Sequence, residues 1–367
     1  MTRLLLTHLA RVVLLTSFLA HAAAQTPPQA QGAIKWHPGH YMSVRNSHKY
    51  DDADQGYITQ IANEPTIRGI LRDWNWRDIE TSKGVYDFSG IDTYLHTVKS
   101  LPSHKQMIIR IENRVFGQGG TTVPDYLKTD PVFQGGEVPM GNGVVARIWD
   151  APVMDRLIAL YQALAARYDS DPTVEGIGTS ETAIGFSKEH PAPSTYSNGA
   201  LVMQLERFLL AARAAWGHSN VFVETNYLGS DAQMEDFIRH CMTSRIVVGG
   251  PDTWNRTYLA AGTRALQSDA IVTGARGSGT DYRGVVAIKS EVEATELGGY
   301  IATFTPAEVY DVAFNIMHAN FIFWDRNDYT GGAAQQWTTG ILPFIRSVGG
   351  KAYTACPSSF SNSCVTN

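Results

Sequence analysis

The sequence is short of cysteine, of positive charge and of long apolar runs, and each shortage excludes a class of protein. Only 3 of the 367 residues are Cys, so a dense disulfide framework is excluded, and no Cys and His spacing matches a zinc site. Lys and Arg number 30 against 35 Asp and Glu, a formal net charge of −5, whereas nucleic-acid-binding domains are usually basic. A glycine-rich dinucleotide fingerprint after a strand is also missing. We therefore expect no metal, no cofactor and no nucleic-acid partner.

The one long, mostly apolar run, Leu4–Leu19, stands at the beginning of the chain. It follows Arg3 and precedes Ala22–Ala24, an arrangement typical of a secretory signal peptide with a small-residue cleavage site. We expect residues 1–24 to be removed and residues 25–35, rich in Gln and Pro, to be a flexible lead-in. The product is expected to be soluble and secreted or periplasmic. Since no second stretch is long and apolar enough to span a bilayer, no membrane association is expected after cleavage.

Short apolar runs alternate with amphipathic segments along the rest of the chain, without a linker or a low-complexity stretch. The amphipathic segments predict helices, and the clearest start signal is a capping box at Thr305–Glu308 with Pro at the first helical position. Eight strands that each precede a helix predict an α/β protein with a single-domain (β/α)8 TIM barrel over residues 36–350. The alternative is a doubly wound open sheet, which usually shows a glycine fingerprint after its first strand. The predicted strands are His40–Val44, Gly69–Trp74, Gln106–Glu112, Val174–Glu181, Val221–Asn226, Arg245–Asp252, Val285–Glu291 and Asn320–Trp324.

Residues 351–367 are a Ser- and Asn-rich C-terminal tail that holds two of the three cysteines. Cys356 and Cys364 are candidates for a disulfide that would close a short loop. Cys241 lies in an apolar-periodic segment and is expected to be a buried free thiol.

In a (β/α)8 barrel, functional groups lie at the carboxyl ends of the strands. The predicted strands end in carboxylates, Arg, Asn and aromatic residues. Carboxylates supply acids, bases and nucleophiles, aromatic rings offer flat apolar faces to sugars, and Arg and Asn hold hydroxyl groups. The combination is typical of carbohydrate chemistry, in which two carboxyl groups flank the bond that is cleaved. Candidate substrate-binding residues are Arg72, Trp74, Glu112, Ser180, Asn226, Tyr227, Trp254 and Trp324.

Two glutamates stand out by position, because Glu181 ends the fourth predicted strand and Glu291 ends the seventh. Strand alternation puts Ile177 on the same side as Glu181, and it puts Lys289 and Glu293 on the same side as Glu291. Glu293 is therefore an alternative nucleophile. The alternative to a catalytic role is that both glutamates belong to structural ion pairs.

Other charged residues are expected to support this pair. Arg72 is a candidate for keeping the nucleophile ionised. Glu112 and Glu224 are expected to be partners of Arg110 or Arg72. The loops Phe116–Val144 and Ser187–Asn198 are expected to shape the cleft.

The segment Trp76-Arg77-Asp78-Ile79-Glu80, followed by Gly84-Val85-Tyr86-Asp87-Phe88 and Ile91-Asp92, resembles the region after the second strand of clan A glycoside hydrolases. The resemblance implies a barrel that hydrolyses a β-linked glycan with retention, so the expected partner is an oligo- or polysaccharide. It also implies an acid/base Glu that ends the fourth strand, here Glu181, and a nucleophile that ends the seventh, here Glu291. A Trp after the eighth strand commonly forms the floor of the sugar site, and the matching residue is Trp324.

One residue departs from that pattern. Clan members usually have Asn immediately before the acid/base Glu, where it binds the sugar 2-hydroxyl, and this chain has Ser180. A Ser hydroxyl has a shorter reach than an Asn amide and a single donor. Two alternatives therefore stay open: a barrel that binds glycans without cleaving them, and a transglycosylase that uses the same two glutamates.

Overall fold

In the computed structural model the described residues are 32–44, 52–117, 120–253, 271–292, 304–326 and 336–366. The predicted signal peptide lies outside them. Eight parallel strands form one sheet in the order β12-β11-β10-β6-β3-β2-β14-β13. Their bounds are β2 (Gly39–Val44), β3 (Ile67–Asn75), β6 (Gln106–Glu112), β10 (Val174–Glu181), β11 (Asn220–Glu224), β12 (Val247–Gly249), β13 (Lys289–Val292) and β14 (Phe321–Asp325).

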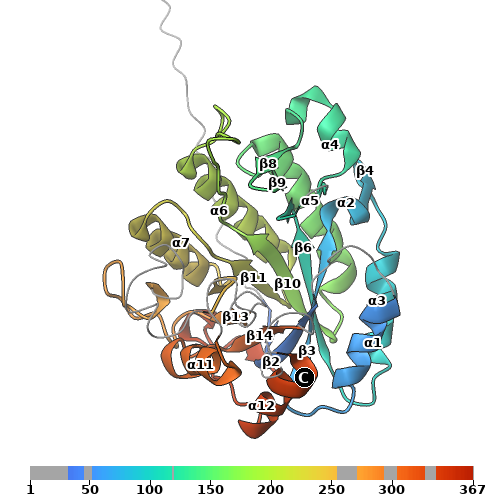
Figure 1. Ribbon diagram of the computed structural model, residues 1–367, viewed down its shortest axis with the longest axis vertical. Helices are drawn as coiled ribbons and strands as arrows, with labels where there is room; N and C mark the ends of the chain where they lie inside the picture. The colour runs from blue at the N-terminus through green and yellow to red at the C-terminus, as the bar shows by residue number, and fades with distance from the viewer. Residues whose placement is uncertain are drawn as a thin grey trace, which may run out of the picture. The chain divides into compact units, whose positions relative to one another are not determined.

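The two edge strands of this sheet meet, so that the sheet closes on itself. The backbone N–H of Val248 on β12 donates to the carbonyl of Ala287, just before β13, at 2.9 Å, and Val248 forms a parallel bridge with Ile288. Each strand thus lies beside the next one in the chain, and the described helices lie outside the ring of strands (Figure 1). The (β/α)8 fold predicted from the alternation is confirmed.

Nine α-helices are described, and none of them is long and apolar enough to cross a bilayer. The predicted capping box is present: the Thr305 side chain accepts from the Glu308 N–H, and the Glu308 carboxylate accepts from the Thr305 N–H. A π-helical turn, Asp311–Ile316, continues that helix. The helices are α1 (Asp52–Ile61), α2 (Trp76–Ile79), α3 (Ser89–Lys99), α4 (Asp125–Thr129), α5 (Ala151–Tyr168), α6 (Asn198–Ala215), α7 (Asp231–Thr243), α11 (Pro306–Tyr310) and α12 (Leu342–Ser347).

Strands β12 and β13 start at least two residues later than predicted, for local reasons. β12 starts at Val247 rather than Arg245, because Arg245 has a left-handed backbone (φ 55°) and the Ile246 N–H still bonds to the end of α7. β13 starts at Lys289 rather than Val285, because the N–H groups of 285 and 286 both bond to the carbonyl of Tyr282 in a turn. Apolar β-branched residues therefore overstate strand length where a turn uses their backbone groups.

The core has two layers, set by the alternation of side chains along the strands. Outward-facing side chains, such as Met42 and Ile70, pack in one large cluster with the helices. Inward-facing side chains fill the barrel interior next to the amino-terminal ends of the strands. This inner cluster consists of Ile34, Trp36, Tyr41, Leu71, Ile108, Phe222, Val247, Ala287, Phe321, Phe323 and Phe360.

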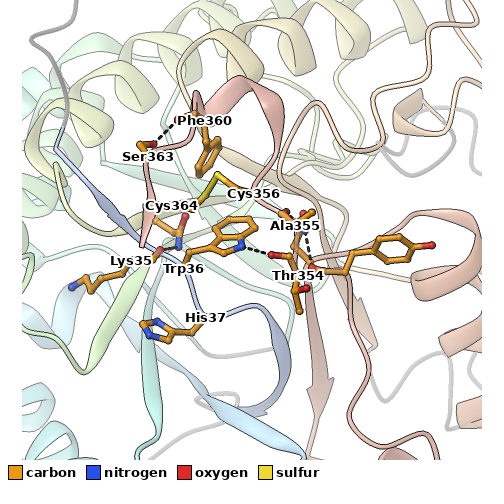
Figure 2. Close-up of a disulfide and its surroundings, with 12 residues drawn as sticks. Lys35, Trp36, His37, Thr354, Ala355, Cys356, Phe360, Ser363 and Cys364 are labelled. Carbon is orange, nitrogen blue, oxygen red and sulfur yellow. Dashed lines mark hydrogen bonds between the residues drawn. A yellow bond between two sulfur atoms is a disulfide. The ribbon is translucent and has the colours of Figure 1, made fainter. Parts of the chain in front are cut away.

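Segments from both ends of the described chain close the amino-terminal end of the barrel, which we call the floor. β1 (Ile34–Lys35) pairs in parallel with β15 (Cys364–Val365). The Trp36 ring packs edge to face on Phe321, 5.2 Å between centroids, and its indole N–H donates to the carbonyl of Thr354 (Figure 2). Cys356 and Cys364 form a disulfide that holds the tail against this layer.

We expect the double variant Cys356→Ala, Cys364→Ala to lose about 2–3 kcal/mol in free energy of unfolding, because the open tail gains conformational entropy in the unfolded chain. Denaturant unfolding measures the change. A thiol reductant should lower the midpoint of the wild type by a similar amount and leave the double variant unchanged, since Cys241 is buried and unpaired. Equal midpoints for wild type and double variant would contradict the expectation.

Candidate active site

Toward the carboxyl ends of the strands, the inward-facing positions change from apolar to charged. The change occurs on six of the eight strands, and it produces a cluster of carboxylates with two cations. These residues are Asp73 on β3, Arg110 and Glu112 on β6, Glu181 on β10, Glu224 on β11, Lys289 and Glu291 on β13, and Asp325 on β14.

Arg110 lies at the centre of this cluster, with its guanidinium buried. Its Nε and Nη2 donate to the two carboxylate oxygens of Asp73 at 2.7 and 3.0 Å. Its Nη1 donates to both oxygens of Glu291 at 2.8 Å and to Glu224 Oε1 at 3.1 Å. One cation from the third strand thus links carboxylates of the second, fifth and seventh.

Lys289 supplies the second cation. Its Nζ donates to Glu291 Oε2 at 2.9 Å and to Glu224 Oε1 at 3.2 Å. Burial, and next the negative charge of Glu291, raise the pKa of the Glu224 carboxyl well above its usual range. Glu112 and Glu224 are therefore partners of Arg110, as expected from the sequence.

Glu291 is fully buried, and both its oxygens accept from cations. Thr253 fixes the backbone beside it by donating to the Glu291 carbonyl at 2.8 Å. The supporting role expected of Arg72 therefore falls to Arg110. Arg72 is buried on the outer side of β3, where its guanidinium lies 5.4 Å from the Trp74 ring centroid.

Glu181 lies on the adjacent side of the same barrel end. The Asn226 amide donates to Glu181 Oε2 at 2.9 Å, and Arg114 Nη1 donates to Oε1 at 3.3 Å. Arg114 also donates to the backbone carbonyls of Glu181 and Ala183, which fixes the guanidinium. In the register of β10 and β11, Glu181 is the partner of Glu224. The predicted residues Glu181, Asn226 and Glu291 are thus brought to one end of the barrel.

An irregularity in β10 explains how Glu181 reaches this side. The register with β11 shifts between Gly178 and Glu181. Ile177 packs in the outer cluster, whereas Glu181 pairs with an inward-facing residue. The expectation that Ile177 and Glu181 share a side is wrong, because a bulge inserts a residue and breaks the alternation.

The Ser180 hydroxyl is engaged within the protein. It donates to the Glu112 carboxylate and accepts from the backbone N–H of Asn113 at 3.0 Å, and Ser180 is buried. The Glu112 side chain is 19% exposed, against 14% for Glu181 and none for Glu291. Glu112 and Glu181 are therefore the carboxylates in this cluster that a ligand can reach most readily.

Two predicted sugar-binding tryptophans lie elsewhere. Trp74 is fully buried against Tyr94 of α3, with ring centroids 5.8 Å apart. Trp324 is fully buried in the outer cluster, and its Nε1 donates to His40 Nδ1 at 2.9 Å. Along β13, alternation turns Glu291 inward and Val292 outward. Trp324 is the register partner of Val292, so it also faces outward. Trp74 belongs to the same outer cluster, so both tryptophans pack against helices.

Aromatic side chains near Glu181 are more exposed. Tyr227, a predicted site residue, follows Asn226 and is 46% exposed. Phe116 is 59% exposed, and its ring centroid lies 6.0 Å from the Arg114 guanidinium. The sequence analysis found Phe116 only as the start of a loop, since a lone aromatic residue in a loop carries no periodic signal. Trp254 and Glu293 lie outside the described residues.

The motif that carried the family resemblance has a structural role here. Glu80 accepts from the Trp76 indole at 2.8 Å, from the Gly84 N–H at 2.8 Å and from the Tyr126 hydroxyl at 3.0 Å. Arg156 of α5 pairs with the same carboxylate. The motif therefore folds the loop after β3 and fastens it to a helix.

No family model and no curated protein matches this sequence. Among solved structures, the catalytic domain of a β-amylase from Paenibacillus polymyxa has a TM-score of 0.56 at 11% identity, over 80% of this chain and 93% of that one. A GH5_18 protein from Streptomyces cattleya, in complex with GlcNAc, has a TM-score of 0.54 at 12% identity, over 86% and 80%. Endo-glycoceramidase II from Rhodococcus sp. has a TM-score of 0.52 at 13% identity, over 86% and 78%. These likenesses agree with the (β/α)8 barrel that the sequence predicted.

We expect Arg110→Met to lower the free energy of unfolding by about 3–5 kcal/mol, because Asp73 and Glu291 lose the cation that compensates their buried charge. Urea unfolding measures the loss. Arg167→Met is the matched control, since Arg167 also makes two hydrogen bonds to one aspartate, Asp92, but on the exposed surface. Its loss should be far smaller, and equal losses in the two variants would contradict the assignment.

Proposed function

We propose that this chain is a glycoside hydrolase that cleaves a β-linked glycan with retention, with Glu181 as acid/base and Glu291 as nucleophile. One observation carries the proposal: Glu181 and Glu291 lie toward the carboxyl ends of the fourth and seventh strands on the inner side of the barrel. Glu224 is the register partner of Glu181, and Lys289 donates to both Glu224 and Glu291. Retaining glycosidases need two carboxyl groups on either side of one glycosidic bond. The glycoside hydrolases among the structural neighbours support the reaction class.

The reaction would proceed in two displacements. In the first, a carboxylate oxygen of Glu291 attacks the anomeric carbon, the bond to the leaving oxygen breaks, and Glu181 gives that oxygen its proton. In the second, Glu181 takes a proton from water, whose oxygen attacks the same carbon and releases Glu291 as a carboxylate. The anomeric configuration is inverted twice and hence retained.

The surroundings of the two glutamates fit unequal roles. Arg110 and Lys289 hold Glu291 as a carboxylate, the state that a nucleophile needs. Glu181 is partly exposed, so it is accessible to the leaving group and to water. Asn226 and Tyr227, next to Glu181, would hold sugar hydroxyls and a sugar face. Glu112 would accept from a sugar hydroxyl in place of Ser180, whose hydroxyl it already binds. The site role predicted for Trp254 stays a prediction.

A second candidate function is glycan binding without cleavage. The complete burial of Glu291 favours it, because an anomeric carbon reaches that carboxylate only after the groups that cover it move. Binding at the exposed rings of Phe116 and Tyr227 needs no such movement.

We also propose that the protein is exported, as the predicted signal peptide indicates. The disulfide between Cys356 and Cys364 supports export, because disulfides persist in oxidising compartments and are rare in the cytosol of most organisms.

The proposal is tested with the protein lacking residues 1–24, on a panel of β-linked oligosaccharides and aryl glycosides, beside Glu181→Gln and Glu291→Gln. We expect the wild type to release sugar with the β-configuration retained, as NMR of the first product shows. Glu291→Gln should lose at least about 1,000-fold in kcat on every substrate. Glu181→Gln should lose most on substrates with poor leaving groups, which need a proton, and least on nitrophenyl glycosides.

Asp236→Asn, on the exposed surface of α7, serves as the control and should behave like the wild type. If Glu112→Gln abolishes turnover while Glu291→Gln does not, the pair is Glu112 and Glu181. If no substrate is cleaved but one binds, the non-catalytic alternative is correct. An inverted first product would exclude retention.

A further inference from the structure

Two buried carboxyl groups share the same two cations inside the barrel. Arg110 Nη1 and Lys289 Nζ each donate to both Glu224 and Glu291, and the two carboxyl side chains have exposed fractions of 6% and 0%. Two like charges held this close and away from water disfavour double ionisation, and burial and the Glu291 charge raise the pKa of Glu224. One proton on the pair relieves this repulsion.

The cations nearby decide which glutamate carries that proton. Glu291 accepts from Arg110 twice at 2.8 Å and from Lys289 at 2.9 Å, on both oxygens. Glu224 has the same two neighbours, at 3.1 and 3.2 Å, on one oxygen only. Shorter and more numerous charge-assisted bonds stabilise the carboxylate form. These contacts favour Glu291 as the ionised member of the pair and leave Glu224 as the member that holds a proton.

The charges around the pair agree with one neutral member. Two described cations, Arg110 and Lys289, contact the pair. The other described carboxylates of the cluster are Asp73 and Glu112, both within 4 Å of Arg110, Glu181, the register partner of Glu224, and Asp325 on β14. Among the described residues, Arg110 also faces Asp73 and Glu112 besides the pair, so an ionised Glu224 would add to an excess of buried negative charge.

We propose that Glu224 is a neutral carboxylic acid that donates a hydrogen bond to Glu291 and so positions that carboxylate for attack. In its catalytic consequence, the inference rests on the proposed function. Glu224 is a positioning residue, since it acts through Glu291. Loss of its proton at alkaline pH would place a second negative charge beside the nucleophile and turn a donor into an acceptor.

The protonation state is testable without a substrate, by thermal unfolding of wild type and Glu224→Gln between about pH 5 and pH 8. In the unfolded chain Glu224 ionises near its ordinary pKa, whereas the folded protein keeps the proton. The wild type therefore loses stability relative to the variant as the pH rises through this window, since glutamine does not titrate. We expect the Tm of Glu224→Gln minus that of the wild type to increase steadily with pH.

Glu64→Gln is the matched control, because Glu64 is buried and paired with Arg346, and its pKa is lowered. A carboxyl group whose pKa is lowered by folding contributes stability that is fully present at any pH above its pKa in the unfolded chain. The Tm of Glu64→Gln minus that of the wild type should therefore stay constant between about pH 5 and pH 8. A constant difference for Glu224→Gln would show an ionised Glu224 and overturn the proposal.

The positioning role is tested by the pH profile of kcat on a substrate that the wild type cleaves. Glu224→Gln keeps a donor toward Glu291 and should lower kcat by less than about tenfold, with its activity extending to higher pH than that of the wild type. Glu224→Ala lacks the donor and should lose roughly 10- to 100-fold in kcat, with KM little changed. An unchanged alkaline limb in Glu224→Gln would overturn this role. If no glycan is cleaved at all, the thermal unfolding measurements between about pH 5 and pH 8 still decide the protonation state of Glu224.

Discussion

The arrangement of the charged barrel end depends on one buried guanidinium. Arg110 has donors in a fixed planar fork, so the three carboxylates that accept hydrogen bonds from it must approach from set directions. Asp73 takes one edge, and Glu291 and Glu224 share the other. A lysine at this place would neutralise charge without fixing directions. The Arg110 side chain thus helps to fix the positions of the second, fifth and seventh strands relative to the third. Each of these charges would be unstable in the barrel interior without its partners.

Much of this arrangement was predictable from the sequence, because strands and their alternation leave strong local signals. Gln106–Glu112 and Val174–Glu181 were predicted to the residue. The two-residue alternation of side chains along the strand correctly placed Glu291 on the same side as Lys289. The partnership of Glu112 and Glu224 with Arg110 followed from the chemistry of buried charge, since carboxylates inside a barrel require a cation.

The errors about which side chains face the site share one physical cause, which is that a shift of a single residue decides the side of the sheet on which a side chain lies. Trp324 lies near the end of its strand, which runs on to Asp325, but it stands one position after the inward-facing Phe323, so it packs against helices. A bulge in β10 turns Glu181 inward by a shift that no periodic pattern contains. The proton on Glu224 was equally beyond prediction, since it depends on distances between strands that are far apart in sequence.

The floor of the barrel has a consequence for the order in which the protein can be completed. β1 and β15 lie far apart in the sequence, yet they pair with each other, and the Trp36 ring packs between Phe321 and Phe360. During synthesis, β1 therefore cannot pair with β15 until all the strands of the barrel have been made. Pairing across so long a separation costs the entropy of closing the whole intervening chain, so this step is expected to be slow compared with the folding of any one strand and helix. The floor is thus the part of the barrel that is completed after the strands.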